Sequence, residues 1–198
     1  MKTAALGFRA HSGWTALIAL AATKDGPSVL ARQRLHLVET FTYEFRQPFH
    51  TAEKMKFDEA RAFISRSEAE AKRLAFGAIR DLKADLRGRG HELARCGLLL
   101  SSGRPLPALP QILASHSLIH SADGELFRDA LLHASNHCGL KAFTIREREL
   151  VDSAAHTLRI TAGDLTRRVA DLGRPLGPPW SQDEKLASLV AWLALASK

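Results

Sequence analysis

The chain has 198 residues, 45% of them hydrophobic and 25% charged, and it carries a formal net charge of +7. This composition excludes gross disorder, and the length favours a single domain over residues 1–198. The basic charge favours an anionic partner, nucleic acid or a phosphorylated ligand, and the lack of an apolar run of roughly 18 residues excludes a membrane span.

The first predicted feature is a β-hairpin. One apolar run leads into the cluster Arg9, His11, Ser12 and Gly13, and a second apolar run leaves it. Glycine permits the left-handed backbone of a tight turn, so we expect polar side chains at the mouth of the hairpin. We expect the hairpin to lie in the middle of a sheet, where Arg9, His11 and Ser12 meet later loops around a phosphate.

A third strand is predicted over 29–38, after a turn at 24–27, because apolar and basic residues alternate there. Phe41, Tyr43 and Phe45 continue the alternation. This pattern is consistent with an extension of the strand, which the residues around Pro48 would then end.

The remainder of the chain alternates helices with strands. A long helix over 58–87, capped by Asp58, has one apolar stripe, and the apolar stretch 93–100 predicts a strand buried on both faces. The later predicted elements are a helix from 109 to 115 or as far as 120, a helix over 125–138 capped by Asp123, a strand over 140–145, helices over 147–157 and 162–172, and a last helix with a capping box of Ser181 and Glu184. Short turns between the first strands make them antiparallel, and helical crossovers make the later strands parallel. The fold class is therefore α/β, with a mixed five-stranded sheet in a three-layer architecture.

The cysteines and the amino-terminal stretch indicate the cellular compartment. Cys96 and Cys138 lie in apolar surroundings without a CxxC pair, so we expect free thiols in a reducing compartment. Lys2 and the apolar run at 14–22 faintly resemble a secretory signal peptide, but Arg9 and His11 interrupt the apolar stretch. We therefore expect a cytoplasmic protein.

Three stretches carry a resemblance to a known superfamily. They are the strand and turn at 6–13, the segment from 124–131 through Ile145, and the helix start at 183–187. Together with the order of the elements, they resemble the ribonuclease H-like superfamily, and loosely the bacterial Holliday-junction resolvases. The resemblance implies a ribonuclease H-like fold, and nucleic acid as the partner.

The same resemblance implies a nuclease that holds two divalent cations with clustered carboxylates, because hard cations need anionic oxygen ligands. This sequence departs from that pattern. The acid of the first strand would fall at Arg9, and the acid of the fourth strand would fall near Ser101 or Ser102. Asp183, Glu184 and Glu125 are the acids left as catalytic candidates, so a divalent metal is expected only if the protein is an enzyme.

The tetrapeptide Gly-Arg-Pro-Leu occurs twice, at 103–106 and 173–176, each time in a loop that leads into a helix. One hypothesis places Arg104 and Arg174 in a crevice near Arg9, where both grip an anion. The alternative is that both loops are rigid connections whose arginines face solvent. Ser101 and Ser102 could present backbone amides to the same phosphate.

Histidines suggest a different chemistry. His116 and His120 are four residues apart, so they share one face of a helix and suit a transition metal. The third ligand is open, with Asp123 or His11 as candidates, and the alternative is that both histidines simply face solvent. His133 and His137 repeat the spacing.

Three functions are compatible with these patterns. The first is a ribonuclease H-like domain that binds an anionic partner, with nucleic acid preferred, without two-metal cleavage; Arg32 and Arg34 would extend its basic surface. The second is a metal-dependent nuclease or phosphoryl-transfer enzyme that uses Asp183, Glu184, Glu125 and a histidine with a divalent metal. The third is a non-catalytic interaction domain that forms a homodimer through the edge of the opening sheet.

Overall fold

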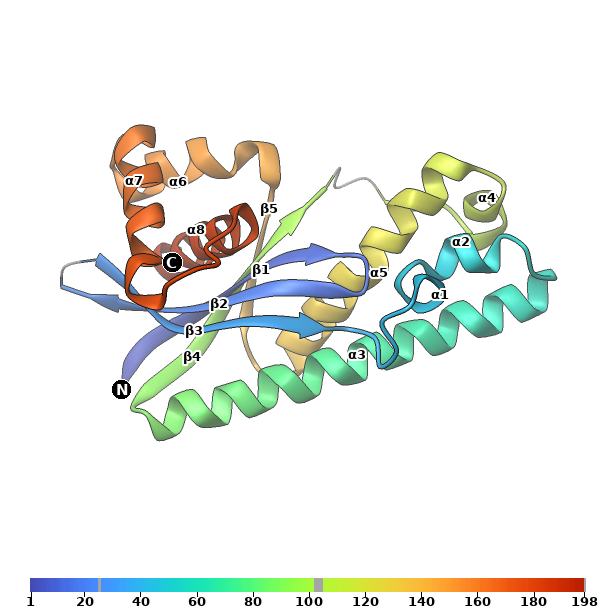
Figure 1. Ribbon diagram of the computed structural model, residues 1–198, viewed down its shortest axis with the longest axis horizontal. Coiled ribbons are helices and arrows are strands. Elements are labelled where there is room, and N and C mark those ends of the chain that lie inside the picture. Colours follow the sequence, from blue (N-terminus) through green and yellow to red (C-terminus); the bar gives the residue numbers. More distant parts are fainter. Residues whose placement is uncertain (25, 102–104, 198) are drawn as a thin grey trace.

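Five strands form one mixed sheet through the middle of the molecule (Figure 1). The computed structural model describes residues 1–24, 26–101 and 105–197. The strands are β1 (Lys2–His11), β2 (Trp14–Thr23), β3 (Gly26–His36), β4 (His91–Leu100) and β5 (Lys141–Arg146). Their order across the sheet is β3-β2-β1-β4-β5, so the predicted central position of the opening hairpin is confirmed.

Strand pairing also follows the prediction. β1 pairs antiparallel with β2 and parallel with β4, β2 pairs antiparallel with β3, and β4 pairs parallel with β5. Gly13 has a φ of +81° in the turn between β1 and β2. Its carbonyl oxygen accepts a hydrogen bond of 2.9 Å from the Leu37 N–H, which ties the turn to the end of β3.

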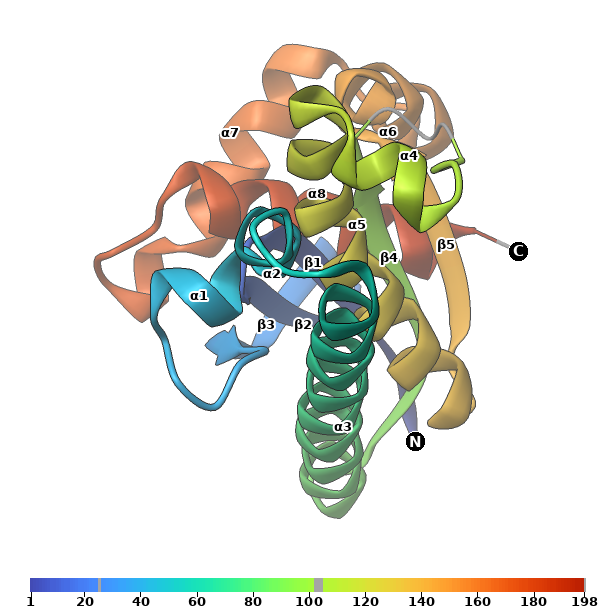
Figure 2. The ribbon, with the colours of Figure 1, turned by 90° about the vertical axis from the view of Figure 1, so that its right-hand side faces the viewer.

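Helices cover both faces of the sheet. They are α1 (Tyr43–Arg46), α2 (Pro48–Ala52), α3 (Phe57–Gly88), α4 (Leu109–Leu113), α5 (His116–His137), α6 (Leu150–Leu158), α7 (Ala162–Leu172) and α8 (Gln182–Ala196), with short 3-10 segments η1 (Glu147–Glu149) and η2 (Arg174–Leu176). The long α3 lies on one side of the sheet, and α6, α7 and α8 lie on the other (Figures 1 and 2). No helix within the described residues is long and apolar enough to cross a bilayer.

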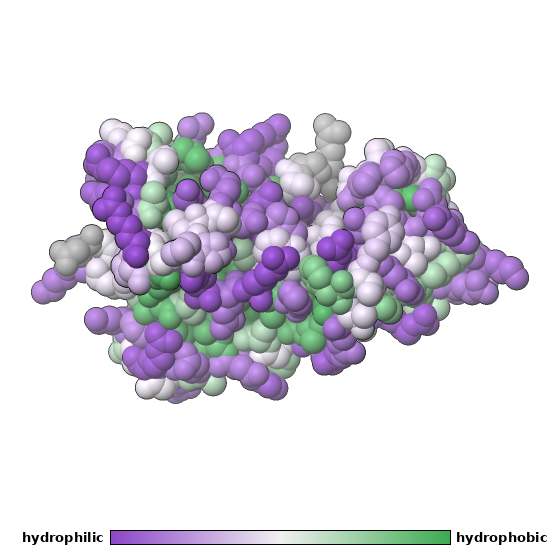
Figure 3. All heavy atoms as spheres, in the orientation of Figure 1, coloured by the Kyte–Doolittle hydropathy of each residue, from purple (hydrophilic) through white to green (hydrophobic). Residues whose placement is uncertain are grey.

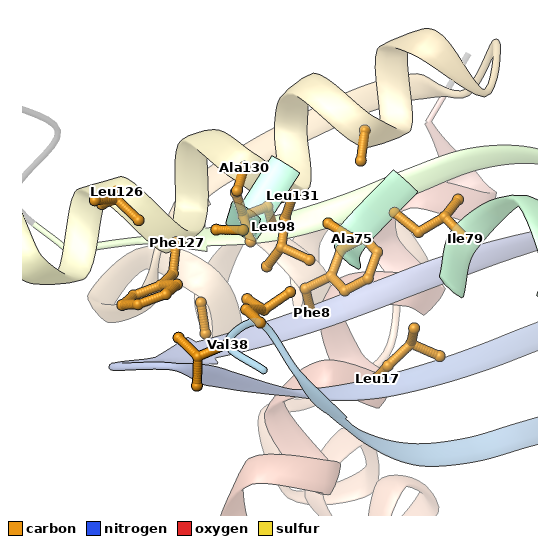
Figure 4. Packing of buried hydrophobic residues seen from close by; sticks show 14 of the residues in the cluster. Phe8, Leu17, Val38, Ala75, Ile79, Leu98, Leu126, Phe127, Ala130 and Leu131 are labelled. Carbon is orange, nitrogen blue, oxygen red and sulfur yellow. The ribbon is translucent and has the colours of Figure 1, made fainter. Parts of the chain in front are cut away.

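The larger core lies between the sheet and the helices α3 and α5. Phe8, Leu17 and Leu98, from three neighbouring strands, are fully buried in it. They face Ile79 of α3 and Phe127 of α5 (Figure 4). Since alternate residues of a strand point to opposite faces, the residues next to these in the chain meet the other helical layer.

Two glycines allow α8 to pack closely on that second face. Gly7 of β1 and Gly97 of β4 are neighbours in the strand register. A β-carbon on Gly7 would lie 1.9 Å from the carbonyl oxygen of Ala187, and one on Gly97 would lie 2.5 Å from that of Val190. The backbone of α8 therefore rests on the sheet where side chains are missing, and this contact sets the position of its first turn beside the end of β1.

The prediction of an extended strand beyond residue 38 is wrong. The chain instead forms the short helix α1, and Pro48 begins α2. The three aromatic residues have separate environments, because Phe41 stacks on His36, Tyr43 is exposed and the ring of Phe45 lies 6.2 Å from that of Phe63. Their alternation in sequence therefore does not reflect two faces of a sheet.

The prediction of an N-terminal cap at Asp123 is also wrong. α5 begins at His116, and Asp123 lies within it with a side chain that is 2% exposed. Its carboxylate accepts hydrogen bonds from the Phe49 backbone N–H, at 2.8 Å, and from Nδ1 of His50. An acidic residue before an apolar run can cap its own helix or accept hydrogen bonds from a neighbouring helix, as Asp123 does from α2. Its spacing in the sequence does not distinguish the two roles.

The predicted caps of the last two helices are confirmed. Thr161 Oγ1 accepts a hydrogen bond of 3.1 Å from the Asp164 N–H, and Ser181 and Glu184 form the capping box of α8. These caps begin each helix at the predicted residue because they supply partners for otherwise unpaired backbone N–H groups.

Candidate functional site

The end of β1 meets the first turn of α8. His11 is the last residue of β1, and Asp183 is the second residue of α8. Nε2 of His11 lies 2.9 Å from Oδ1 of Asp183, and both side chains are about one-third exposed. The close packing of α8 on Gly7 and Gly97 brings this pair together across 172 positions of the chain.

Arg9 lies two residues before His11 on β1. One terminal nitrogen of its guanidinium is 3.0 Å from Oε2 of Glu147, which follows β5 in η1. The other donates to the Ala10 carbonyl, whereas its buried Nε has no partner among the described residues. The permanently charged guanidinium of Arg9 therefore occupies the position at which the ribonuclease H-like resemblance implies a metal-binding acid.

The remaining candidate acids have partners of their own. Glu184 accepts from the Ser181 N–H at 2.8 Å in the capping box of α8. Glu125 accepts from Ser101 Oγ at 3.0 Å and from Arg128 at 2.9 Å. Because the carboxylates are spread over separate contacts, they do not converge on one point with Asp183 in the described part of the chain.

Aromatic and basic side chains gather at the mouth of the hairpin. The His11 ring stacks on Trp14 with centroids 4.4 Å apart and planes 12° apart. The guanidinium carbon of Arg34 lies 3.8 Å from the Trp14 ring centroid, a distance typical of a cation–π contact. Trp14 faces His11 on β1 and His36 on β3 in the strand register, so the sheet itself aligns these side chains.

Arg46 extends this group beyond the sheet. Its guanidinium lies 4.8 Å from the Phe41 ring centroid, and its buried Nε has no partner among the described residues. Its aliphatic stem passes over Gly13, where a β-carbon would come within 2.6 Å of Arg46 Cγ. We call the set Arg9, His11, Trp14, Arg34, Phe41 and Arg46 the basic–aromatic surface.

Sequence reasoning missed Trp14 and Arg46 as members of one site. Arg34 was expected, together with Arg32, to extend a basic surface. The available signal was the basic Arg46 directly after the aromatic residues of 41–45, but the alternation of those residues suggested a strand instead. Ser12 is where it was expected, in the turn next to Gly13.

Arg174 faces solvent, which agrees with the second of the two alternatives for its loop. It forms an ion pair of 3.0 Å with Asp171 and is 80% exposed. Leu172 and Leu176, on either side of it, border a cavity with Pro27 at the start of β3.

The loop after η2 is held in place by Arg32. Its guanidinium donates to the carbonyl oxygens of Gly177, at 2.9 Å, and Pro179, at 2.8 Å. Arg32 therefore anchors this loop to β3, whereas the sequence suggested that it adds to a basic surface. Ser102 and Arg104, the remaining members of the predicted anion site, lie outside the described residues.

His116 and His120 lie at the other end of the molecule from α8, on the first turns of α5 (Figure 1). Their third neighbour is His50 of α2, and neither predicted third ligand occupies that place. His11 pairs with Asp183, and Asp123 contacts His50 from behind. Burial raises the pKa of Asp123, while its hydrogen bonds with His50 and the Phe49 N–H lower it.

The strand order, with an antiparallel hairpin followed by parallel crossovers, defines the ribonuclease H-like fold. Solved structures with this arrangement include RuvC of Thermus thermophilus in complex with a Holliday junction substrate. The two chains superpose with a TM-score of 0.55 and 8% sequence identity, and the match covers 96% of this chain and 90% of the RuvC chain. A second structure of Thermus thermophilus RuvC matches with a TM-score of 0.55 and 9% sequence identity. This match covers 96% of this chain and 91% of the RuvC chain. No family model and no curated protein matches the sequence. The likeness is one of fold.

Proposed function

We propose that the protein binds nucleic acid through the basic–aromatic surface and does not perform two-metal cleavage. The fold supports the choice of partner, because a protein of the same fold, RuvC, is seen in complex with a Holliday junction. The formal charge of +7 supports it independently, since a basic protein attracts a polyanion.

The observation that carries the proposal is the placement of Arg34 over Trp14 and of Arg46 near Phe41. Guanidinium groups neutralise phosphates, and a partly exposed aromatic ring beside them can stack on a base, so the two together suit a nucleic-acid strand. Phe41 is 37% exposed, which leaves part of its ring available for such a contact.

The absence of two-metal cleavage is proposed from Arg9. A divalent cation beside its guanidinium would be repelled, and the carboxylate of Glu147 is already paired with the arginine at 3.0 Å. The acids at the start of α8 are also engaged, Asp183 by His11 and Glu184 by the helix cap. These residues support recognition of an anion better than coordination of two hard cations.

Fluorescence anisotropy with labelled single strands, duplexes and four-way junctions tests the proposal across a range of salt concentrations. We expect Arg34→Gln and Arg46→Gln each to weaken binding and to lower the slope of log K against log salt by about 1. The matched control is Arg80→Gln, because Arg80 also lies near an aromatic ring, that of Phe76, but on α3 outside the surface. No binding at low salt, or equal losses in all three variants, would refute the proposal.

The His11–Asp183 pair favours a second candidate, a metal-dependent nuclease or phosphoryl-transfer enzyme. A histidine held by a carboxylate is a suitable general base. Incubation of the same labelled substrates with Mg²⁺ or Mn²⁺ tests this candidate, with Asp183→Asn as the control. Cleavage by the wild type that is lost in this variant would establish the enzyme and exclude the non-cleaving proposal.

A third candidate is an interaction domain that dimerises through β3, which lies at one edge of the sheet. Figure 3 shows apolar surface along the middle of the molecule, between the α6–α8 layer and α3. Light scattering of the purified protein tests this candidate. A monomer at all concentrations would exclude it without affecting the nucleic-acid proposal.

A further inference from the structure

Three histidines from two helices converge at the end of the molecule distant from α8. His50 comes from the short helix α2, and His116 and His120 come from successive turns at the start of α5. These helices lie side by side (Figures 1 and 2). One nitrogen of each ring lies within 4.8 Å of the corresponding nitrogens of the other two.

The distances between the rings suit a small metal ion. Nε2 of His116 and Nε2 of His120 are 3.1 Å apart. A tetrahedral zinc ion with bonds of about 2.0–2.1 Å separates its ligand nitrogens by roughly 3.4 Å, so this pair is close to the required geometry. The His50 ring is 4.3 Å from that of His120 and 5.3 Å from that of His116, centroid to centroid. The three nitrogens lie within 4.8 Å of one another, and the exposed side chains of His116 and His120 have room to rotate towards a shared ion.

Asp123 orients the buried member of the group. The side chain of His50 is 8% exposed, and its Nδ1 is hydrogen-bonded to Oδ2 of Asp123. The other carboxylate oxygen accepts the Phe49 N–H, so Asp123 is held from both sides. With Nδ1 occupied, Nε2 is the nitrogen of His50 that remains for a metal, which is the usual arrangement of a carboxylate behind a metal-binding histidine.

We propose that His50, His116 and His120 bind a transition-metal ion of the zinc type, with Asp123 positioning His50. Imidazole nitrogens favour zinc and its neighbours over magnesium or calcium, which need oxygen ligands. Three protein ligands leave the fourth tetrahedral position for water or an anionic group. Because His116 and His120 are exposed, that position is accessible from solvent. This site is separate from the basic–aromatic surface, and neither proposal depends on the other.

The chain provides its own control for adventitious binding by histidine. His133 and His137 lie on the same helix with the same spacing, and their ring centroids are 4.0 Å apart. Both are exposed, and among the described residues they form no group of three with another histidine, cysteine or acid. A pair without a third ligand should bind metal weakly.

Calorimetric titration of the chelator-treated, tag-free protein with Zn²⁺ tests the proposal. We expect one strong equivalent, unchanged in a His133→Ala, His137→Ala double variant. His120→Ala should weaken binding by about 100-fold or more, and Asp123→Asn by about 10- to 100-fold. Because His120 is exposed, its variant should remain folded, which circular dichroism checks.

Two further measurements make the outcome decisive. Co²⁺ should produce the intense visible absorption of a tetrahedral site in the wild type but not in His120→Ala. Zn²⁺ should also raise the Tm of the wild type and leave that of His120→Ala unchanged, because only a folded site is stabilised by its ligand. The site does not exist if the wild type lacks a strong equivalent, or if His120→Ala binds Zn²⁺ as the wild type does.

Discussion

Replacement of Gly7 by alanine should disrupt the contact that positions α8. The new β-carbon would lie 1.9 Å from the Ala187 carbonyl oxygen and 2.8 Å from the Ala191 nitrogen, and both atoms belong to the helix backbone. To reach ordinary contact at 3.4 Å, the helix must move by about 1.5 Å. Overpacking of a core costs about 1–3 kcal/mol, and we expect the upper end because backbone cannot rotate away.

A loss of about 3 kcal/mol in the free energy of unfolding corresponds to a fall in Tm of roughly 6–12 °C for a chain of this size. Urea and thermal unfolding followed by circular dichroism measure both quantities. Gly77→Ala is the control, since Gly77 lies inside α3 with open space around its Cα, and this change should stabilise by about 0.5–1 kcal/mol. If Gly7→Ala were as stable as the wild type, the close packing of α8 on β1 would be wrong.

Three other predictions follow from individual contacts. Ser181→Ala removes the capping box of α8 and should lower the free energy of unfolding by about 1 kcal/mol in urea; no change would show that the cap is unimportant. Burial raises the pKa of the Cys96 thiol, so the unfolded chain loses this proton first as pH rises. The free energy of unfolding should therefore decrease above a pH of about 8.5, and it should decrease less in Cys96→Ala than in the wild type. Urea unfolding at a series of pH values measures this difference. Arg9→Gln should cost less than about 1 kcal/mol of stability, because its pair with Glu147 is partly exposed, yet should reduce the salt slope of nucleic-acid binding by about 1.

Much of the fold could be predicted because its causes are local. Gly13 marks the first turn, alternation marks β3, and one apolar stripe marks α3. The caps at Thr161 and Ser181 begin two helices at the predicted residues. Where local rules conflicted, as in residues 39–57, the prediction failed, since packing against α3 decided the outcome for Phe45.

The candidate sites were only partly predictable. The sequence pointed to Arg9 and His11, and to His116 and His120, because each pair is close in the chain. It could not supply the distant partner of either pair, Asp183 for His11 or His50 for the two histidines of α5. It also left open whether Arg174 grips an anion near Arg9 or faces solvent, and in the structure Arg174 is 80% exposed and paired with Asp171.

Outside residues 39–57, the sequence by itself determined the types of element, their order and the mixed pairing of the sheet, because secondary-structure propensity and hydrophobic period act over a few residues. Only the tertiary structure decided which side chains meet. Gly7 and Gly97 let α8 approach the sheet, and Asp123 joins α2 to α5. Such contacts depend on the packing of whole elements, and no spacing along the chain records them.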